Sequence, residues 1–293
     1  MRIPTVIVEN KKISRIILSI RTGAPSPRSE MSSLLEKAYG MGFSHFDLPT
    51  MKHLEAFREL MSLTEDENLT GFCHLDVKEG VSFLGRPLHS FESKIIATLK
   101  KNLPPEIIRH LIPSSSSPEV FTQKEIDRFS FDPHRLDKAL SSLRPGESPF
   151  LITGERYGDW LLALGRIDLL QKMVTTARER GFIPLFSGQW ATFSLPNAKP
   201  LEVAAYAVPI NKKRGLFDLA HACELIKRFD KPVISLNPLA NGELLNEPET
   251  AFTFLFDELK IYAAITEVAS EEEVKKILDG LARSPSFILP RKA

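Results

Sequence analysis

The alternation of strand-like and helix-like segments predicts an α/β fold for this chain, and within that class a (β/α)8 TIM barrel with an N-terminal β-hairpin. Short β-branched runs alternate with amphipathic segments from Ile13 to Leu281, and roughly eight such units fit a chain of 293 residues. No GxGxxG motif follows an early strand, which favours a barrel over an open, doubly wound sheet. Since no linker-like segment interrupts the alternation, we expect one domain over residues 1–293.

The first expected elements are the hairpin and the opening strand–helix unit. The β-branched runs at 5–9 and 13–20, joined by polar residues, predict a hairpin that leads into the first buried strand. Residues 32–40 predict a helix that ends at Gly40. The segment GFSHFDLP then predicts the second strand, with Asp47 near its end.

The regular rhythm breaks between residues 61 and 103, where we expect an insertion. LTGFCHLDVKEGVSFLGRPLHS contains two short strand-like runs around a polar turn, and SKIIATLKKNL then predicts a helix with basic residues near its end. EIIRHLIP, residues 106–113, is the next candidate for a buried strand. The polar loop Ser114 to Ser117 after it is compatible with a mobile lid or with plain solvent exposure.

The second half of the chain returns to regular alternation. Asp132 and Pro133 predict a helix start, because a carboxylate cap followed by proline suits the first turn. SPFLIT and FIPLFSG predict strands on either side of an amphipathic helix at 167–180. The remaining strands and helices are expected to alternate over residues 203–210, 216–229, 232–236, 251–259, 262–265 and 271–281.

Composition excludes several classes of protein. With 43% hydrophobic and 26% charged residues the chain lies outside the disordered range. Lys and Arg number 38 against 37 Asp and Glu, so no overall field favours nucleic acid or anionic lipid. Cys73 and Cys223 are far apart and lack CxxC spacing, which argues against a disulfide framework or a structural zinc site and for a reducing compartment. The N-terminus resembles neither a signal peptide nor a membrane span, so the cytoplasm is the expected location.

Three segments, in this order, resemble the aldo-keto reductases. LLEKAYGMGFSHFD, residues 34–47, is similar to that family's helix and second strand ending in a catalytic aspartate. FDPHRLDKALSSLRPGESPFLIT, residues 131–153, is similar to the helix and strand that lead to its catalytic histidine, and KPVISLNPLANGELL to its seventh strand and following loop. The resemblance implies a TIM barrel and nicotinamide-dependent carbonyl or alcohol chemistry, in which a tyrosine acid, assisted by a lysine, gives a proton to the substrate.

The resemblance also implies the catalytic candidates. Asp47 matches the family's aspartate, and Lys52, five residues later, could pair with it. Alternatively, Asp47 is a structural cap of the next helix and Lys52 an ordinary surface lysine. The other positions of the tetrad do not carry the family's residues; tyrosine, lysine and histidine fall respectively at Met51 or Lys52, Leu111 or Ile112, and Thr153 or Gly154.

The cofactor positions are partly kept. GFIPLFSG is similar to the family's fifth strand and makes Ser187 a candidate cofactor contact, together with Asn237 and Leu239 of the seventh unit. NAD(P) is therefore the implied cofactor. In AAITEVASEEEVKKIL, similar to the eighth unit, Glu267 and Glu271–Glu273 stand where basic residues would hold the nucleotide phosphate, and this charge opposes a 2′-phosphate.

Other candidate groups have plain alternatives. His74 and Asp76 alternate on one strand face with the spacing of metal ligands, or belong to an ordinary polar strand face. Arg109 and His110 line the mouth of the barrel, or one of them extends to water. An aromatic group could wall an apolar pocket or belong to the core: Phe182, Phe186, Trp190 and Phe193.

Two functions follow from the sequence. The first is a divergent aldo-keto-reductase-like oxidoreductase with altered acid–base residues. The alternative is a catalytically inactive barrel that binds a small molecule or a protein. For both, we expect a small-molecule site where Asp47, Thr153, Ser187 and Asn237 converge, since each closes a predicted strand and the carboxyl ends of barrel strands share one face.

Overall fold

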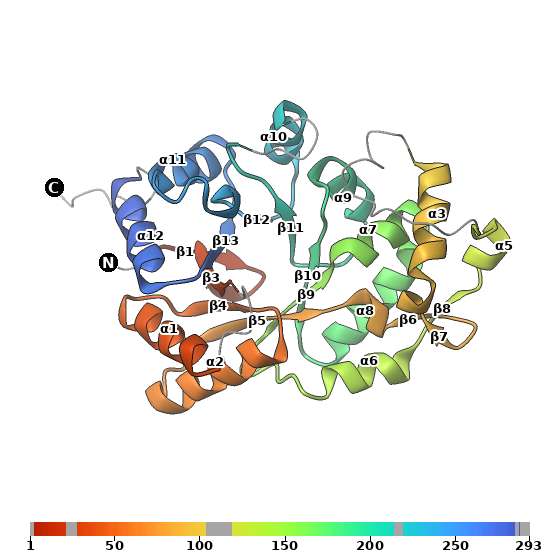
Figure 1. The fold of residues 1–293 in the computed structure, drawn as a ribbon, viewed down its shortest axis with the longest axis horizontal. Coiled ribbons are helices and arrows are strands. Elements are labelled where there is room, and N and C mark those ends of the chain that lie inside the picture. Colours follow the sequence, from red (N-terminus) through yellow and green to blue (C-terminus); the bar gives the residue numbers. More distant parts are fainter. Residues whose placement is uncertain (1–2, 22–27, 104–118, 214–218, 285–286, 288–293) are drawn as a thin grey trace.

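Eight parallel strands close into a barrel in this computed structural model, which describes residues 3–21, 28–103, 119–213, 219–284 and 287 (Figure 1). The predicted fold class is therefore confirmed. The strands follow one another around the barrel as β3 (Ile16–Ile20), β4 (His45–Leu48), β5 (Thr70–Leu75), β9 (Phe150–Gly154), β10 (Ile183–Ser187), β11 (Ala205–Pro209), β12 (Val233–Leu236) and β13 (Ala263–Val268), and β13 pairs with β3.

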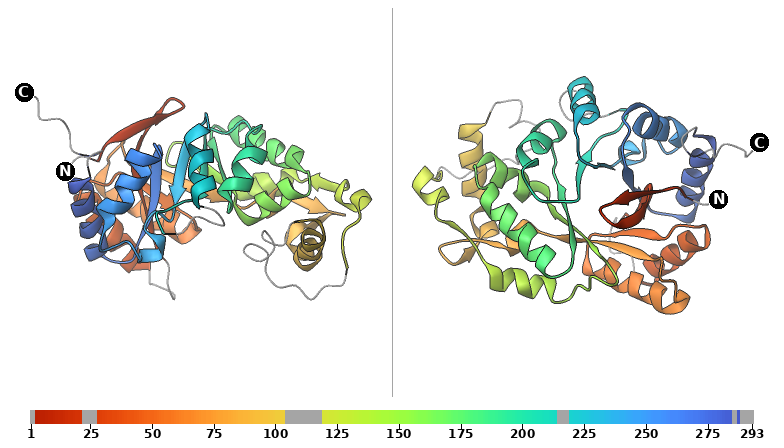
Figure 2. Two further views of the ribbon diagram at one scale, coloured as in Figure 1. Left: turned by 90° about the horizontal axis from the view of Figure 1, so that it is seen from above. Right: turned by 180° about the vertical axis from the view of Figure 1, so that it is seen from behind.

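The predicted N-terminal hairpin is present and closes one end of the barrel. Strands β1 (Thr5–Val8) and β2 (Lys11–Ser14) pair antiparallel, and Glu9 in the turn has a positive φ of 51°. Val8 and Ile13 are fully buried against the barrel interior. Figure 2 shows the hairpin lying across this opening, which is the end where the strands begin. The opposite end, where the strands finish, is left to form a site.

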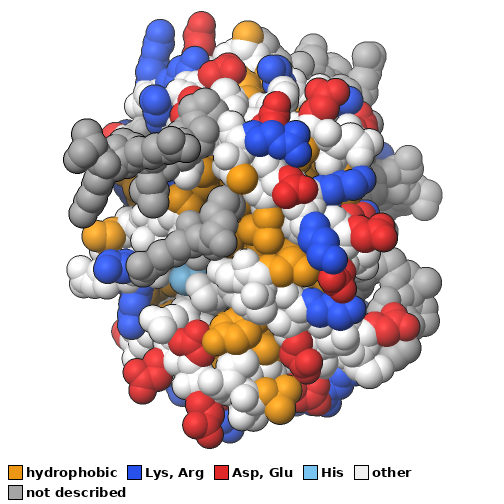
Figure 3. Space-filling view, turned by 90° about the vertical axis from the view of Figure 1, so that its left-hand side faces the viewer, with side chains coloured by type: hydrophobic (Ala, Val, Ile, Leu, Met, Phe, Trp, Pro, Cys, Tyr) orange, Lys and Arg blue, Asp and Glu red, His pale blue; other side chains and the backbone are white. Residues whose placement is uncertain are grey.

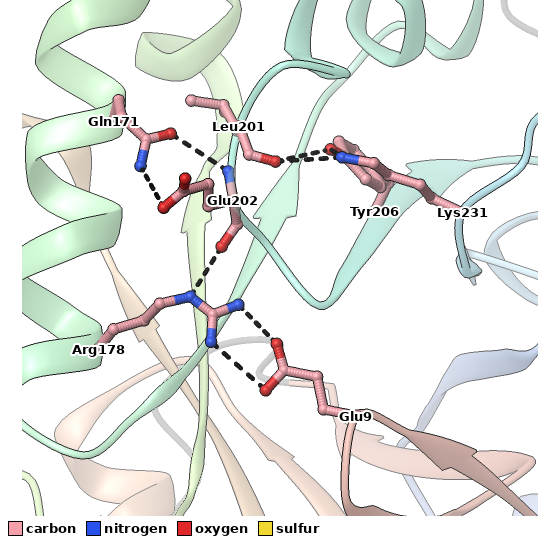
Figure 4. Close-up of polar contacts among 7 residues, drawn as sticks. All are labelled: Glu9, Gln171, Arg178, Leu201, Glu202, Tyr206 and Lys231. Atoms are coloured by element: carbon pink, nitrogen blue, oxygen red, sulfur yellow. Dashed lines mark hydrogen bonds and ion pairs between the residues drawn. The ribbon is translucent and has the colours of Figure 1, made fainter.

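Polar contacts hold the hairpin and the loop before β11 in place at the closed end (Figure 4). Arg178 donates to both carboxylate oxygens of Glu9, and its Nε donates to the carbonyl of Glu202 at 2.8 Å. Tyr206 and Lys231 both donate to the carbonyl of Leu201. These bonds satisfy backbone oxygens that a turn of this kind would otherwise leave unpaired.

Helices surround the barrel, and the helix start predicted at Asp132 and Pro133 is confirmed. Asp132 accepts from the backbone N–H of Arg135 with Pro133 in the first turn, and Ser270 accepts from that of Glu273. The helices that pack around the strands are α1 (Arg28–Gly40), α2 (Met51–Thr64), α6 (Pro133–Leu140), α7 (Glu155–Ala163), α8 (Ile167–Glu179), α9 (Ala191–Ala198), α10 (Leu219–Arg228), α11 (Pro248–Thr253), the π-helix η4 (Phe254–Glu258) and α12 (Glu271–Arg283).

The insertion begins later in the chain than the sequence analysis placed it. Residues 70–75 form β5, the third barrel strand, which pairs with β4 and β9. The barrel closes without residues 106–113, which lie outside the described residues, as does the Ser114 to Ser117 loop. The sequence analysis expects a strand-like run here but assigns it to the insertion, whereas the structure makes it a barrel strand with His74 near its end.

The excursion between β5 and β9 forms a small lobe, at the right of Figure 1. Its core is a set of aromatic rings in edge-to-face contact, with Phe83 within 5.5 Å of Phe91, Phe121 and Phe129 between ring centroids. The elements of the lobe are η1 (Val77–Glu79), β6 (Val81–Phe83), β7 (Arg86–Pro87), η2 (Leu88–Phe91), α3 (Glu92–Asn102), α5 (Gln123–Ile126) and β8 (Phe129–Phe131); β6 pairs with β7 and β8.

Charges of both signs are interspersed over the described part of the surface seen in Figure 3. Ion pairs on the described surface include Arg28 with Glu55 and Lys37 with Glu271. In the part of the chain that the structure describes, no helix is both long and apolar enough to cross a membrane.

Candidate functional site

Three charged side chains meet at the open end of the barrel. His74 at the end of β5 donates from Nε2 to Oδ1 of Asp47 at 2.7 Å and from Nδ1 to Oε1 of Glu155 at 2.9 Å. The second oxygen of Asp47 accepts from the hydroxyl of Ser19 at 2.8 Å. We call Asp47, His74 and Glu155 the charge network. It links the ends of three neighbouring strands, β4, β5 and β9.

Strand alternation explains why these side chains point inward. Side chains two residues apart share one face of a strand, and Phe72 and Ile17 belong to the cluster that fills the barrel interior. His74 therefore follows Phe72 on the inner face, and Ser19 follows Ile17. Asp47 pairs in register with Ser19 and with Phe72, which brings its carboxylate into the same layer.

Glu155 reaches the network through an unusual backbone turn. Gly154 has a φ of 117° and Glu155 a φ of 50°, both in the left-handed half of the map. A Cβ on Gly154 would lie 2.3 Å from the carbonyl oxygen of Ser187, so that only glycine fits there. Such conformations persist where the surroundings enforce them, and they are common at functional sites.

The network fixes the charge of His74. Burial opposes the charge, but the carboxylate of Asp47 and the hydrogen bonds to Asp47 and Glu155 outweigh it and raise the pKa of His74 to about 10. The hydrogen bond from His74 in turn lowers the pKa of Glu155, against the effect of burial. At neutral pH His74 is thus an imidazolium between two carboxylates, and the network has one net negative charge.

A second histidine beside the network is neutral. His53 of α2 is 1% exposed; its Nε2 donates to the carbonyl of Ile20 at 3.1 Å, and its Nδ1 accepts from the hydroxyl of Thr50 at 2.7 Å. Burial lowers its pKa. The open end of the barrel therefore contains one charged and one neutral imidazole.

A groove of about 680 Å³ runs from the network along the outside of the barrel, between α2 and α6. His74 and Glu155 lie at its inner end. Its apolar lining includes Leu48, Pro49, Met51, Leu54, Leu75, Ala139 and Leu143, and its charged lining is Asp76, Lys78, Glu79, Arg135 and Lys138. The volume lies in the range of small-molecule sites.

The residues predicted from the sequence fall at different places. Asp47 is 5% exposed and central to the network, whereas Lys52 is exposed in the first turn of α2 and makes no described contact with Asp47. Ser187 is 2% exposed at the end of β10. Thr153 lies near the end of β9, at the same end of the barrel. Because its neighbour Ile152 points into the barrel, Thr153 points outward to the helices. The expectation that Thr153 joins the other three residues at one site was therefore wrong.

Asn237 and Leu239 belong to the turn after β12. Asn237 has a φ of 52°, and its side-chain oxygen accepts from the N–H of Asn241 at 2.6 Å. Its carbonyl accepts from the side chain of Asn211 at 3.1 Å. Leu239 is 4% exposed. These contacts show how the loop is held, and a role toward a cofactor stays a prediction.

The start of α12 is occupied by its own carboxylates. Glu273 accepts from the N–H of Ala269 at 2.8 Å and lies 3.7 Å from a guanidinium nitrogen of Arg21. Glu271 pairs with Lys37 at 3.0 Å and with Lys275 at 2.6 Å, and these two lysines lower its pKa to about 2. Lys37, Lys275 and Arg21 are thus already paired with carboxylates at this helix start.

The structure also decides between the alternative interpretations of other residues. Asp76 accepts from the N–H of Lys78 and pairs with its ammonium, whereas His74 is bonded to Asp47 and Glu155, so the two side chains have different partners. Within the described ranges, no group of three or more His, Cys, Asp or Glu could hold a metal ion. Three of the four aromatic residues around β10 are core: Phe182, Phe186 and Trp190. Arg109 and His110 lie outside the described residues.

Sequence reasoning missed the role of two residues. The sequence analysis offers His74 as a metal ligand or as part of an ordinary polar strand face, and not as a partner of Asp47. Glu155 was not considered, although a glycine followed by an acidic residue at a strand end is a signal for a left-handed turn carrying a charge.

Comparison with known proteins agrees with this barrel type. No protein-family model matches the chain, and no curated protein matches its sequence. An aldo-keto reductase from Bacillus halodurans, solved in its holo form, superposes with a TM-score of 0.61 at 11% identity over 97% of this chain and 92% of that one. A putative aldo-keto reductase from Pseudomonas aeruginosa superposes with a TM-score of 0.56 at 14% identity over 95% and 94%.

A thermostable aldo-keto reductase solved with the inhibitor epalrestat gives a TM-score of 0.56 at 12% identity over 99% of this chain and 96% of that one. The whole chain thus has the fold of the aldo-keto reductases, and the predicted resemblance is confirmed at the level of fold. At identities of this size, function has to be argued from the site itself.

Proposed function

We propose that this protein is a small-molecule-binding barrel that has kept the aldo-keto reductase fold while its acid–base site has become a closed charge network. The observation that carries the proposal is the bonding of His74, whose two ring nitrogens both donate to carboxylates. Carbonyl reduction needs a proton donor within hydrogen-bond reach of the substrate oxygen. His74 has no N–H left to offer, and with a pKa of about 10 it holds its proton at neutral pH.

The tyrosines support the same proposal. All four are among the described residues, and no hydrogen bond joins any of them to Asp47, His74 or Glu155 in the part of the chain that the structure describes. Tyr39 donates to the carboxylate of Asp66, and Tyr157 donates to that of Glu92 in α3. Tyr206 donates to backbone oxygens at the closed end, and Tyr262 precedes β13 at that same end. We therefore expect no tyrosine to act as the proton donor that the family's reaction needs.

The second candidate is a nicotinamide-dependent oxidoreductase with altered acid–base residues. Asp47 and Ser187 favour it, since both stand at the ends of strands where the resemblance implies cofactor or catalytic contacts. If a nicotinamide cofactor binds, these two residues and the Asn237 turn are its candidate contacts. The paired carboxylates at the start of α12 weigh against NADP in particular.

Cofactor binding and carbonyl reduction separate the two candidates. Purified protein would be titrated with NADH and with NADPH by calorimetry, then assayed with a panel of aldehydes and ketones beside an authentic aldo-keto reductase. The binding-barrel proposal expects no turnover. Robust reduction that disappears in Asp47→Ala, with the variant's circular dichroism unchanged, would overturn it in favour of the oxidoreductase.

A further inference from the structure

We infer that the groove beside the charge network binds an anionic small molecule with an apolar body, and that Arg135 and Lys138 hold the anion. The inference rests on the proposed ligand-binding function and adds the chemical class of the ligand. Both side chains line the groove, and both come from α6. Because they are three residues apart, they lie on the same face of the helix.

Arg135 and Lys138 have no carboxylate partner among the described residues, whereas Lys78, the third cation in the groove, has one. Lys78 is held by Asp76 at 2.9 Å, and the nearby Asp137 of α6 pairs instead with Arg180 at 2.6 Å. The Nε atom of Arg135 is buried and has no hydrogen-bond acceptor in the described part of the chain. A buried donor without an acceptor costs free energy, which a ligand carboxylate, phosphate or sulfonate oxygen would recover.

The rest of the groove suits an apolar body rather than a free inorganic anion. Met51 lines it and is 45% exposed. Leu48, Leu54 and Leu143 line it as well. Covering these surfaces with an apolar ligand gains about 25 cal/mol for each Å² removed from water.

The charge network determines the orientation of the ligand. It has one net negative charge, from Asp47 and Glu155 against His74, and therefore repels an anion at the inner end of the groove. On the α6 side, the three cations Arg135, Lys138 and Lys78 stand against the two carboxylates of Asp76 and Glu79, which leaves one net positive charge there. We thus place the anionic group against Arg135 and Lys138, and the apolar body along Met51 toward the network.

A charged and an uncharged dye with the same ring system test this arrangement. Anilinonaphthalene sulfonate carries one negative charge, and phenylnaphthylamine is its uncharged counterpart. Both would be titrated by fluorescence into the wild-type protein, Arg135→Gln, Lys138→Gln and the double variant. Lys172→Gln on α8 and Arg228→Gln on α10 are matched controls, since both are exposed helix residues outside the groove. Arg135→Lys keeps the charge, and circular dichroism confirms folding.

We expect the double variant to bind the sulfonate dye about tenfold to a hundredfold more weakly, with the uncharged dye little changed. Arg135→Lys should keep most of the affinity, and the two controls all of it. Equal loss for both dyes, no loss for either, or failure of the wild-type protein to bind the sulfonate dye would each overturn the inference. The proposed function fails separately, through carbonyl reduction that depends on Asp47, whatever the dyes do.

Discussion

Nε2 of His74 lies 2.7 Å from Oδ1 of Asp47, in a contact that leaves the Asp47 side chain only 6% exposed. Each group offsets the free-energy cost of burying the other's charge, because a buried charge is costly unless it is paired and hydrogen-bonded. The pair stands at the open end of the barrel, where acid–base groups of barrel enzymes usually project. Here each member also has a second partner, Ser19 for Asp47 and Glu155 for His74.

Replacing His74 should strongly destabilise the protein. His74→Gln leaves Asp47 buried without its cation, and removal of one partner from a buried ion pair costs about 3 to 5 kcal/mol. We expect a loss of that size in the free energy of unfolding, measured in urea. His89→Gln is the matched control because His89 is exposed in the excursion, and it should have little effect. A loss under about 1 kcal/mol for His74→Gln would show that the network contributes little.

The same network should make stability fall at high pH. The pKa of His74 is raised from 6.5 to about 10 in the folded state, so the folded state binds this proton more tightly. The stabilisation is therefore complete below pH 6.5 and is lost as the pH rises through about 10, with a slope of up to about 1.4 kcal/mol per pH unit. We expect the difference between wild type and His74→Gln to shrink over this window. A constant difference would mean that His74 is neutral in the fold.

How far the sequence predicts this protein depends on the kind of feature. The barrel, the hairpin and the helix starts at Asp132 and Ser270 follow local patterns, in periodicity and capping, that neighbouring residues reveal. Asp47 was found because it ends a strand. The third strand was missed because Phe72 and His74 on its inner face differ in polarity, and the partners that make His74 acceptable inside the barrel lie 27 and 81 residues away in the chain.

Gly154 should be intolerant of any side chain. Gly154→Ala puts a Cβ 2.3 Å from the Ser187 carbonyl at a φ of 117°, and the clash and backbone strain together cost on the order of 2 to 4 kcal/mol. Gly146→Ala is the control, since nothing lies within 4 Å of a Cβ there, and it should stay within about 0.5 kcal/mol of wild type. Chemical denaturation measures both. Equal effects at the two positions would contradict the turn geometry.

Asp159 should make the fold less stable as the pH rises toward neutrality. Burial raises its pKa to about 7, although the hydroxyl of Ser194 and the N–H of Gln189 both donate to it. Because the folded-state pKa lies above the ordinary 3.8, the folded protein favours the protonated acid, and stability falls between pH 3.8 and 7. Asp159→Asn should remove this pH dependence. Relative to the wild type, the free energy of unfolding of the variant should therefore be higher at pH 7 than at pH 4. Asp127→Asn, at an exposed site, should leave the pH profile unchanged.

Affinity for NADPH should not exceed affinity for NADH. Preference for a 2′-phosphate requires a basic partner free to form charge-assisted hydrogen bonds, worth about 1.5 to 3 kcal/mol, or roughly tenfold to a hundredfold in binding. At the start of α12 the basic groups are already engaged: Lys37 and Lys275 pair with Glu271, and Arg21 lies between Glu267 and Glu273.

Calorimetric titration with both cofactors measures the two affinities directly, and one substitution tests the reason given for their order. Glu271→Gln releases Lys37 and Lys275 from their shared carboxylate, so it should raise affinity for NADPH relative to NADH if the nucleotide reaches α12 at all. Glu36→Gln removes an equal charge from an exposed position on α1 and is the control. Tighter binding of NADPH than of NADH by the wild-type protein would mean that a basic group other than these lysines holds the phosphate.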